Sequence, residues 1–360
     1  MKKLMLMVLT AMLLPWASAQ GAGNRILFLP HDDRPISYHQ TVEVVEGAGY
    51  EMLLPPKEML SNATNMGHPE ELWQWLRENA PAAKSAVISS DSLLYGGLIP
   101  SRKHEVSQEE LAERLDNFVR LRRENPGLHI YVFDSLMRTP FEGWVGNIEE
   151  PAYYETYGAH IFQYTRLLDE GETGKLSASE RRELQAYEKA IPEECRKDWF
   201  DRRQKNLSAT KRLMDMTQEG IIDYLILGRD DNAPLCQTHR ENRQILAYAE
   251  EKNLPKSKFQ SLSGIDEFNI LLHRKDECRA KRSSAGGALS GRLGLSGQCA
   301  LMGRYGAGEK FRQLQILLQA GRQARLCGKA QHRAHAGICQ SAHAPDLRRF
   351  HRQAPMAQDV

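Results

Sequence analysis

The stretch Arg25-Ile-Leu-Phe-Leu-Pro-His-Asp-Asp-Arg-Pro35 places a short apolar run directly before a cluster of charged side chains. Short apolar runs of this kind are typical of strands that are buried on both faces of a sheet. The same sequence of apolar run and polar cluster recurs along the chain, and amphipathic stretches separate the runs. This alternation predicts an α/β fold with a parallel sheet and right-handed crossovers.

The spacing of apolar residues predicts six strands, six helices and one long insertion. The predicted strands occupy residues 25–30, 50–54, 85–90, 129–133, 222–227 and 259–262. The predicted helices, with apolar residues three and four apart, occupy residues 40–46, 69–78, 108–123, 180–191, 203–218 and 240–251. Ser107 and Glu110 have the spacing of a capping box for the third helix. The segment between the fourth and fifth strands is too long for one crossover, which predicts a helical insertion at about residues 140–220.

Charged and polar residues follow five of the six predicted strands. The carboxyl ends of parallel strands lie on one side of an α/β fold, where active sites are built. We therefore predict one shared, carboxylate-rich site at the strand ends. A (β/α) barrel is favoured over an open doubly wound sheet, because in an open sheet only the strands near the switch point supply the site.

So many acids at one site indicate acid–base chemistry. Two neighbouring carboxylates cannot both ionise cheaply, so one can act as an acid while another stays a base, as glycoside hydrolysis requires. Several carboxylates could instead bind a divalent cation that activates water, and otherwise no cofactor is expected. The candidate catalytic residues are Asp32, Asp33, Asp91, Asp134, Asp230, Asp231, Asp266 and Glu267.

Within this set, the preferred acid and base are one residue from each of two adjacent pairs, Asp32 or Asp33 and Asp230 or Asp231. Arginines beside the acids could orient an anionic substrate or pair with the carboxylates, since guanidinium groups match both. The candidate substrate-binding residues are Arg34, Tyr95, Arg138, Arg229, Asn232 and His239. The tripeptides Asp91-Ser92-Leu93 and Asp134-Ser135-Leu136 both echo the nucleophile block of a secreted esterase family. The glycine that should precede that block is absent in both, and no Asp-x-x-His motif follows in the body of the chain, so a chance match is favoured.

The first residues have the pattern of a secretory signal peptide, residues 1–19. Lys2 and Lys3 precede a short apolar run, and Ala17-Ser-Ala19 supplies a small-residue cleavage pattern. Cleavage after Ala19 would release a secreted or periplasmic protein. Export disfavours an activity that depends on nicotinamide cofactors or ATP. No later segment is apolar enough to cross a membrane, and the scattered cysteines indicate neither a disulfide framework nor a zinc site.

Residues 273–360 form a tail with a different composition. From Lys281 onward there are 13 Lys and Arg residues and three acids, against 35 and 43 in the preceding residues. The tail could be a basic arm that binds nucleic acid or an anionic membrane. Translation in a shifted frame is favoured, because basic arms are rich in Lys and avoid scattered cysteines. The α/β domain is therefore assigned to residues 20–272, the tail is interpreted as frameshifted or disordered, and nucleic acid is a partner only if the tail is native.

Four motifs in order carry a family resemblance: Asp32-Asp-Arg-Pro35, Asp91-Ser-Leu-Leu-Tyr-Gly-Gly97, Gly228-Arg-Asp-Asp-Asn-Ala-Pro234 together with His239-Arg-Glu-Asn242, and Gly264-Ile-Asp-Glu267. Over about residues 26–272 the chain resembles the bacterial family catalogued as domain of unknown function 4127. The resemblance implies an α/β fold and no defined activity. Members look longer and continue with α/β pattern beyond Glu267, so any site residue from that part would be missing here.

The preferred functional hypothesis is an exported hydrolase whose substrate is a carbohydrate or glycoconjugate. One alternative is metal-dependent hydrolysis of a phosphoester or acyl group. A second is a non-catalytic binding protein of the cell envelope whose acids hold a cationic or sugar ligand. In each case the partner is a small molecule or glycan. A third is an inactive, truncated product of a disrupted gene.

Overall fold

The computed structural model describes residues 24–140, 149–230, 233–266 and 272. The chain divides into two compact units, residues 1–303 and 304–360, and every described residue belongs to the first. The strands are β1 (Arg25–Leu29), β2 (Glu51–Leu53), β3 (Ser85–Ser89), β4 (His129–Leu136), β5 (Tyr224–Arg229) and β6 (Phe259–Ser263). The α-helices are α1 (His39–Gly47), α2 (Pro69–Asn79), α3 (Ser90–Leu94), α4 (Gln108–Glu124), α5 (Tyr154–Thr173), α6 (Ala178–Ala190), α7 (Glu193–Glu219) and α8 (Gln237–Glu251).

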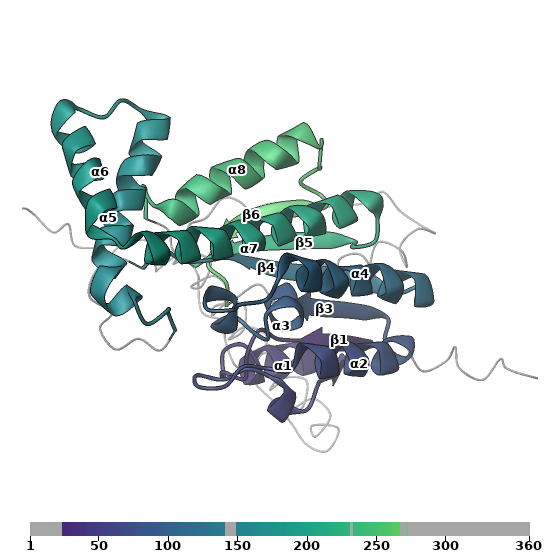
Figure 1. Ribbon diagram of the computed structural model, residues 1–360. Coiled ribbons are helices and arrows are strands. Elements are labelled where there is room, and N and C mark those ends of the chain that lie inside the picture. The colour runs from purple at the N-terminus through teal and green to yellow at the C-terminus, as the bar shows by residue number, and fades with distance from the viewer. Residues whose placement is uncertain (1–23, 141–148, 231–232, 267–271, 273–360) are drawn as a thin grey trace, which may run out of the picture. The chain divides into compact units, whose positions relative to one another are not determined.

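The six predicted strands form one sheet in the order β2-β1-β3-β4-β5-β6, and every neighbouring pair is parallel. The α/β class is therefore confirmed (Figure 1). β4 is longer than the apolar run predicts. It pairs with β5 as far as Leu136 opposite Arg229, so the polar residues Asp134 and Ser135 lie within the strand.

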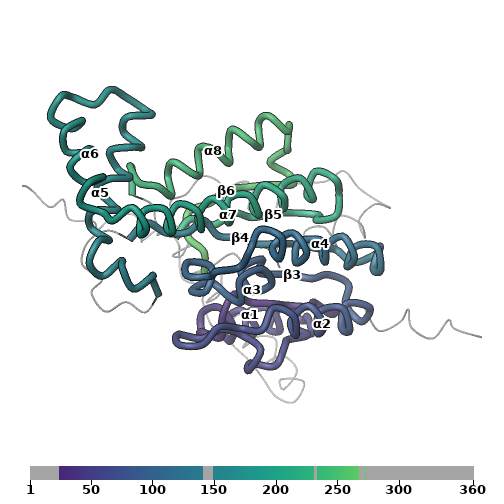
Figure 2. Tube along the Cα trace, viewed as in Figure 1, coloured from purple at the N-terminus to yellow at the C-terminus, as the bar shows by residue number. Residues whose placement is uncertain are grey.

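The first five strands follow the 2-1-3-4-5 order of a doubly wound sheet, whose switch point lies between β1 and β3. The Cα trace runs from β1 in purple to β6 in green across the width of the sheet (Figure 2). Among the described residues β2 and β6 are the two edge strands and do not pair with each other. The preference for a (β/α) barrel, in which the two edges of the sheet would meet, therefore stays a prediction for the whole chain.

Each face of the sheet has its own apolar core. On one face, Leu27, Ile88 and Val132 pack with buried residues of α2, α4, α7 and α8. On the other, Phe28 and Tyr131 pack with residues that include Val45 of α1. The helices form because one stripe of each is apolar. In α4 that stripe is Leu111, Leu115, Phe118 and Leu121, all buried.

Local capping agrees in part with the sequence. Ser107 Oγ accepts a hydrogen bond from the Glu110 amide at 3.1 Å, as expected at the start of α4. The reciprocal capping box is formed instead at the start of α6, by Ser177 and Glu180.

The predicted helical insertion is present between β4 and β5. α5, α6 and the first part of α7 surround a separate small core that includes Tyr154, Tyr164 and Trp199. α7 is 27 residues long, and its second half packs on the sheet through residues such as Leu213. The insertion therefore shares its last helix with the crossover to β5. α5 and α6 stand at the end of the sheet towards which the strands point (Figure 1).

Candidate functional site

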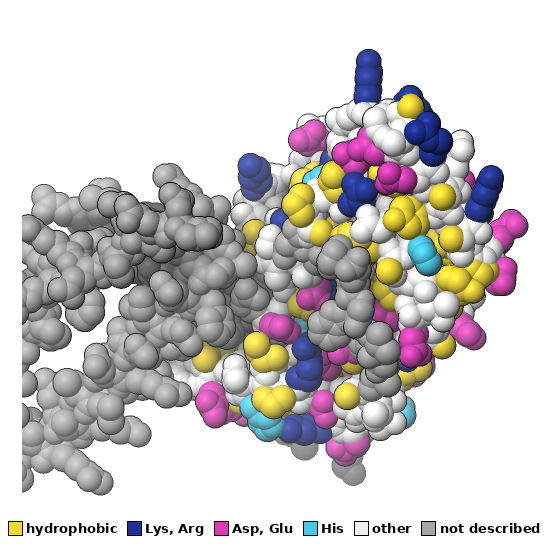
Figure 3. Space-filling view, turned by 90° about the vertical axis from the view of Figure 1, so that its left-hand side faces the viewer, with side chains coloured by type: hydrophobic (Ala, Val, Ile, Leu, Met, Phe, Trp, Pro, Cys, Tyr) yellow, Lys and Arg dark blue, Asp and Glu magenta, His cyan; other side chains and the backbone are white. Residues whose placement is uncertain are grey.

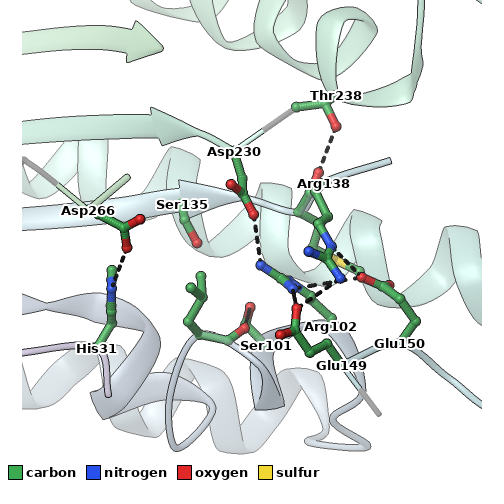
Figure 4. A network of polar contacts seen from close by, with 12 residues as sticks. His31, Ser101, Arg102, Ser135, Arg138, Glu149, Glu150, Asp230, Thr238 and Asp266 are labelled. Atoms are coloured by element: carbon green, nitrogen blue, oxygen red, sulfur yellow. Dashed lines mark hydrogen bonds and ion pairs between the residues drawn. The ribbon is translucent and has the colours of Figure 1, made fainter. Parts of the chain in front are cut away.

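Polar side chains from several loops meet at the carboxyl edge of the sheet (Figure 4). They come from the segments after β1, β3, β4, β5 and β6, as the sequence predicts, and from a segment just before α5. They form three groups, which we call the histidine–aspartate cluster, the buried aspartate pair and the arginine–glutamate cluster. Seen from the side of α5 and α6, acidic and basic side chains are intermixed on the described surface (Figure 3).

The histidine–aspartate cluster consists of His31, Asp32, Arg34 and Asp266. Arg34 Nε donates to Asp32 Oδ2 at 2.7 Å, and its Nη2 donates to Asp266 Oδ1 at 3.2 Å. His31 Nε2 lies 3.7 Å from the same Asp266 oxygen and 3.0 Å from Ser37 Oγ. Burial opposes ionisation of Asp266, but the adjacent His31 and Arg34 outweigh it and lower the pKa of that carboxyl. Asp266 is thus held as a carboxylate, and about a third of its side chain is exposed.

The contact between Arg34 and Asp266 joins two distant parts of the sheet. β1 and β6 are separated by four strand spacings, or about 19 Å in a flat sheet. Gly264 closes this gap, because its φ of +91° turns the chain back and its amide donates to the Arg229 carbonyl at 2.8 Å. The segment after β6 therefore crosses the strand ends and brings Asp266 to the β1 loop.

The buried aspartate pair is Asp91 of α3 and Asp134 of β4. Asp134 is fully satisfied, since Ser90 Oγ donates to one of its oxygens and Thr210 Oγ1 to the other, both at 2.6 Å. Asp91 Oδ2 accepts from Ser135 Oγ at 2.6 Å, while its Oδ1 is buried with no hydrogen-bond partner among the described residues. Burial, and then the neighbouring Asp134, raise the pKa of Asp91 well above its ordinary value. Asp91 is therefore the carboxyl group most inclined to keep a proton.

The arginine–glutamate cluster contains Arg102, Arg138, Glu149, Glu150 and Asp230. Arg102 donates to Glu149 Oε2 and to Asp230 Oδ2, each at 3.0 Å. Arg138 Nε donates to Glu150 Oε1 at 2.7 Å, and its Nη2 forms an ion pair with Glu149 Oε2 at 2.9 Å. Burial and the repulsion of Arg138 lower the pKa of Arg102. Burial raises the pKa of Glu150, although both arginines oppose the shift.

A buried ion pair fixes the backbone that carries Arg138. Arg203 of α7 contacts both carboxylate oxygens of Glu241, through Nε at 2.7 Å and Nη2 at 2.6 Å. The same guanidinium donates to the carbonyls of Met137 and Arg138, at 2.7 and 2.9 Å. Arg203 therefore holds the end of β4 in place.

The remaining predicted residues lie elsewhere. Asp33 is half-buried beside Asp32, and the structure gives its side chain no part in the three groups. Tyr95 is buried and stacks on His104, with ring centroids 4.6 Å apart. Arg229 donates to Ser263 Oγ at 2.9 Å. His239 pairs with Asp169 of α5 at 2.7 Å.

Three further candidates, Asp231, Asn232 and Glu267, lie outside the described residues, as does the predicted signal peptide.

Sequence reasoning missed Glu149 and Glu150, because they follow no strand and lie before α5. The adjacent acids ahead of Pro151 were the only signal for them. Ser135 was set aside with its tripeptide, although its hydroxyl contacts Asp91. Within the described residues no group of three His, Cys, Asp or Glu side chains is arranged to hold a metal ion. None of the helices described here has the length and apolarity needed to span a membrane.

The fold and the site define a class: a parallel α/β protein whose carboxylates and arginines meet at the carboxyl edge of the sheet. The chain belongs to the family described as "Protein of unknown function (DUF4127)", whose sequence model matches residues 26–284. This agrees with the resemblance carried by the four motifs. Comparison with curated proteins and with solved structures found no match.

Proposed function

We propose that this protein is an exported hydrolase that uses Asp91 as its acid and Asp266 as its base, and that its substrate is a carbohydrate or glycoconjugate. One observation carries the proposal: carboxyl groups at the same edge of the sheet have environments that move their pKa values in opposite directions, upwards for Asp91 and downwards for Asp266. Such a separation lets one group donate a proton while another accepts one at the same pH.

The acid step would use Ser135 as a relay. Asp91 is almost completely buried, whereas Ser135 is half-buried and contacts Asp91 Oδ2 at 2.6 Å. A proton on Asp91 Oδ2 can pass to Ser135 Oγ while the serine hydroxyl donates its own proton to a leaving-group oxygen. The two transfers leave Ser135 neutral and Asp91 ionised. Asp230 and Glu150 would support the site as carboxylates around Arg102.

The base step would use Asp266. Arg34 and His31 favour its ionised form, and its partial exposure gives a water molecule access to the carboxylate. Removing a proton from that water generates the nucleophile. A pair of carboxyl groups with these two roles is the machinery of most glycoside hydrolases, which supports a sugar substrate. The predicted signal peptide supports a substrate outside the cytoplasmic membrane.

A second function is favoured by the short contact between Ser135 and Asp91. A serine hydroxyl that donates to a carboxylate at 2.6 Å has the geometry of a nucleophile with its general base. In that case an ionised Asp91 would accept the proton of Ser135 while the serine oxygen attacks an ester or amide carbonyl, and would return that proton to the alcohol or amine as its bond to the carbonyl breaks. Water would then hydrolyse the acyl-enzyme.

The test is turnover by the purified full chain on panels of aryl glycosides, aryl esters and aryl phosphates. Asp91→Asn should lower kcat by about 10²–10⁴ on the glycosides, the usual contribution of a general acid. Asp266→Asn should lower kcat by a comparable factor. Asp116→Asn is the matched control, because Asp116 is an exposed aspartate of α4.

Ser135→Ala separates the two functions. Loss of a relay should cost about tenfold on glycosides, because water can replace the hydroxyl, whereas loss of a nucleophile should abolish ester turnover. Unchanged glycoside turnover in both aspartate variants would refute the preferred function. Activity lost to a chelator and restored by a divalent ion would select the metal-dependent alternative. Binding of glycans without turnover of any panel member would select the binding protein.

A further inference from the structure

A carboxylate oxygen of Glu149 lies between the guanidinium groups of Arg102 and Arg138. Glu149 Oε2 lies 3.0 Å from Arg102 Nη1 and 2.9 Å from Arg138 Nη2, so one anion bridges two guanidinium groups (Figure 4). Two cations this close repel each other, and negative charge between them offsets that repulsion. The buried Glu150 supplies part of this charge, since its Oε1 lies 2.7 Å from Arg138 Nε and 3.8 Å from Arg102 Nη1, and the partly exposed Glu149 supplies the rest.

The arginines are the fixed members of this arrangement, and the glutamate is the replaceable one. The side chains of Arg102 and Arg138 are 3% and 14% exposed, while that of Glu149 is 34% exposed. Arg138 is also held by the buried Glu150 and by the Arg203 contact with its carbonyl. A partly exposed carboxylate on this buried, preorganised cation pair can be exchanged for another carboxylate, because the incoming anion restores the negative charge between the two arginines.

We infer that Arg102 and Arg138 form a binding site for the carboxylate of an acidic sugar, and that Glu149 occupies this site in the free protein. That this ligand is a substrate rests on the proposed function, and the substrate would then be an acidic glycan. The recognition chemistry does not depend on turnover. A planar carboxylate matches the guanidinium fork in the way that Glu149 does.

The charges of the cluster select a monoanion. Among the described residues, the two arginines without Glu149 face Glu150 and Asp230, and the formal charge of these four groups is zero. A sugar carboxylate restores the single negative charge that Glu149 supplies. A phosphate dianion would add a second charge beside two carboxylates, which is disfavoured.

Removing the internal competitor should expose the site. A tethered carboxylate competes at an effective concentration in the millimolar range, so the wild-type chain should bind D-glucuronate only weakly. Glu149→Ala should bind D-glucuronate at least about tenfold more tightly, measured by calorimetry at pH 7 and low salt. D-Glucose is the neutral probe and inorganic phosphate the dianionic one, and neither should gain affinity.

The matched control is Glu170→Ala. Glu170 has the same type of side chain with 32% exposure and pairs with the single Arg166 at 2.8 Å, so its removal leaves one arginine and should create no site. Adding Arg138→Lys to Glu149→Ala keeps the charge but removes the planar fork, and should reverse most of the gain. Circular dichroism and thermal unfolding check that each variant is folded.

Repeating the binding in an Asp91→Asn background separates this inference from the proposed function. Tighter glucuronate binding by Glu149→Ala in that background supports the site whether or not the protein hydrolyses anything. A folded Glu149→Ala with no gain for glucuronate overturns the inference. An equal gain in Glu170→Ala, or a larger gain for phosphate than for glucuronate, overturns it as well.

Discussion

Replacing Asp91 by asparagine should stabilise the protein at neutral and alkaline pH. Asp91 is buried, one of its oxygens has no partner among the described residues, and burial raises the pKa of its carboxyl group. The unfolded chain ionises this group near its ordinary pKa of 3.8, while the folded chain keeps the proton to higher pH. As pH rises above about 4, the unfolded state loses the proton first, so folding free energy is lost.

The size of the effect follows from the unsatisfied oxygen. A buried polar group without a partner costs about 1–3 kcal/mol, and a charged one costs more. Asp91→Asn cannot ionise, so at pH 8 its free energy of unfolding should exceed that of the wild type by about 1–3 kcal/mol. For a domain of this size the gain is about 2–12 °C in Tm. At pH 4 the two proteins should be almost equally stable, because both side chains are then mostly neutral when folded.

Urea unfolding followed by tryptophan fluorescence at pH 4, 6 and 8 measures the difference. Asp134→Asn is the internal comparison. Both oxygens of Asp134 accept hydrogen bonds from hydroxyl groups. Asparagine would replace one of these oxygens with an NH2 group that cannot accept, and the lost hydrogen bond would offset the stability gained by removing the ionisable group. A stability difference for Asp91→Asn that is zero or negative at pH 8, or that is the same at every pH, would show that ionisation of the buried Asp91 does not destabilise the fold.

Three further predictions concern the scaffold of the site. Glu241→Gln leaves the buried Arg203 charge without its carboxylate and should cost about 3–5 kcal/mol in urea unfolding. Gly97→Ala should lower the free energy of unfolding by about 2 kcal/mol or more, because Gly97 has a φ of +135° and a Cβ there would lie 2.0 Å from a serine oxygen. Gly127→Ala is the control, because a Cβ there meets no neighbouring atom and stability should change by less than about 0.5 kcal/mol. Burial lowers the pKa of His104 to about 4, so the unfolded chain takes up a proton before the folded chain does as the pH falls from 7 to 5. The free energy of unfolding should therefore fall by about 2 kcal/mol over this range, and His104→Gln should remove that loss. Equal dependence of stability on pH in both proteins would contradict the prediction.

Strand positions could be predicted closely because they depend on local sequence. All six apolar runs became strands, and their ends differ from the expected ones by a few residues. The largest difference is in β4. Its polar end, Asp134-Ser-Leu136, carries no apolar pattern, yet it continues the strand because β5 supplies hydrogen-bond partners as far as Arg229.

The strand ends also predicted which acids gather at one edge of the sheet. Asp32, Asp91, Asp134, Asp230 and Asp266 all lie in the three groups, as the position of acids after parallel strands predicts. The choice within an adjacent pair could not be predicted, because a turn can direct either side chain inwards. The fold directs Asp32 into the cluster and leaves Asp33 beside it.

Local sequence patterns were enough to predict the alternation of strands and helices, the helical insertion, and the edge of the sheet at which polar residues gather. These follow from periodicity and from the polarity of strand ends, which are properties of short segments. Which charges meet depends on how distant segments pack together. Arg34 and Asp266 are 232 residues apart in sequence, and their contact depends on strand order and on the reversal at Gly264. Glu149 reaches two arginines because β3 and β4 are neighbours in the sheet, and such contacts arise from packing between segments whose separation no local pattern encodes.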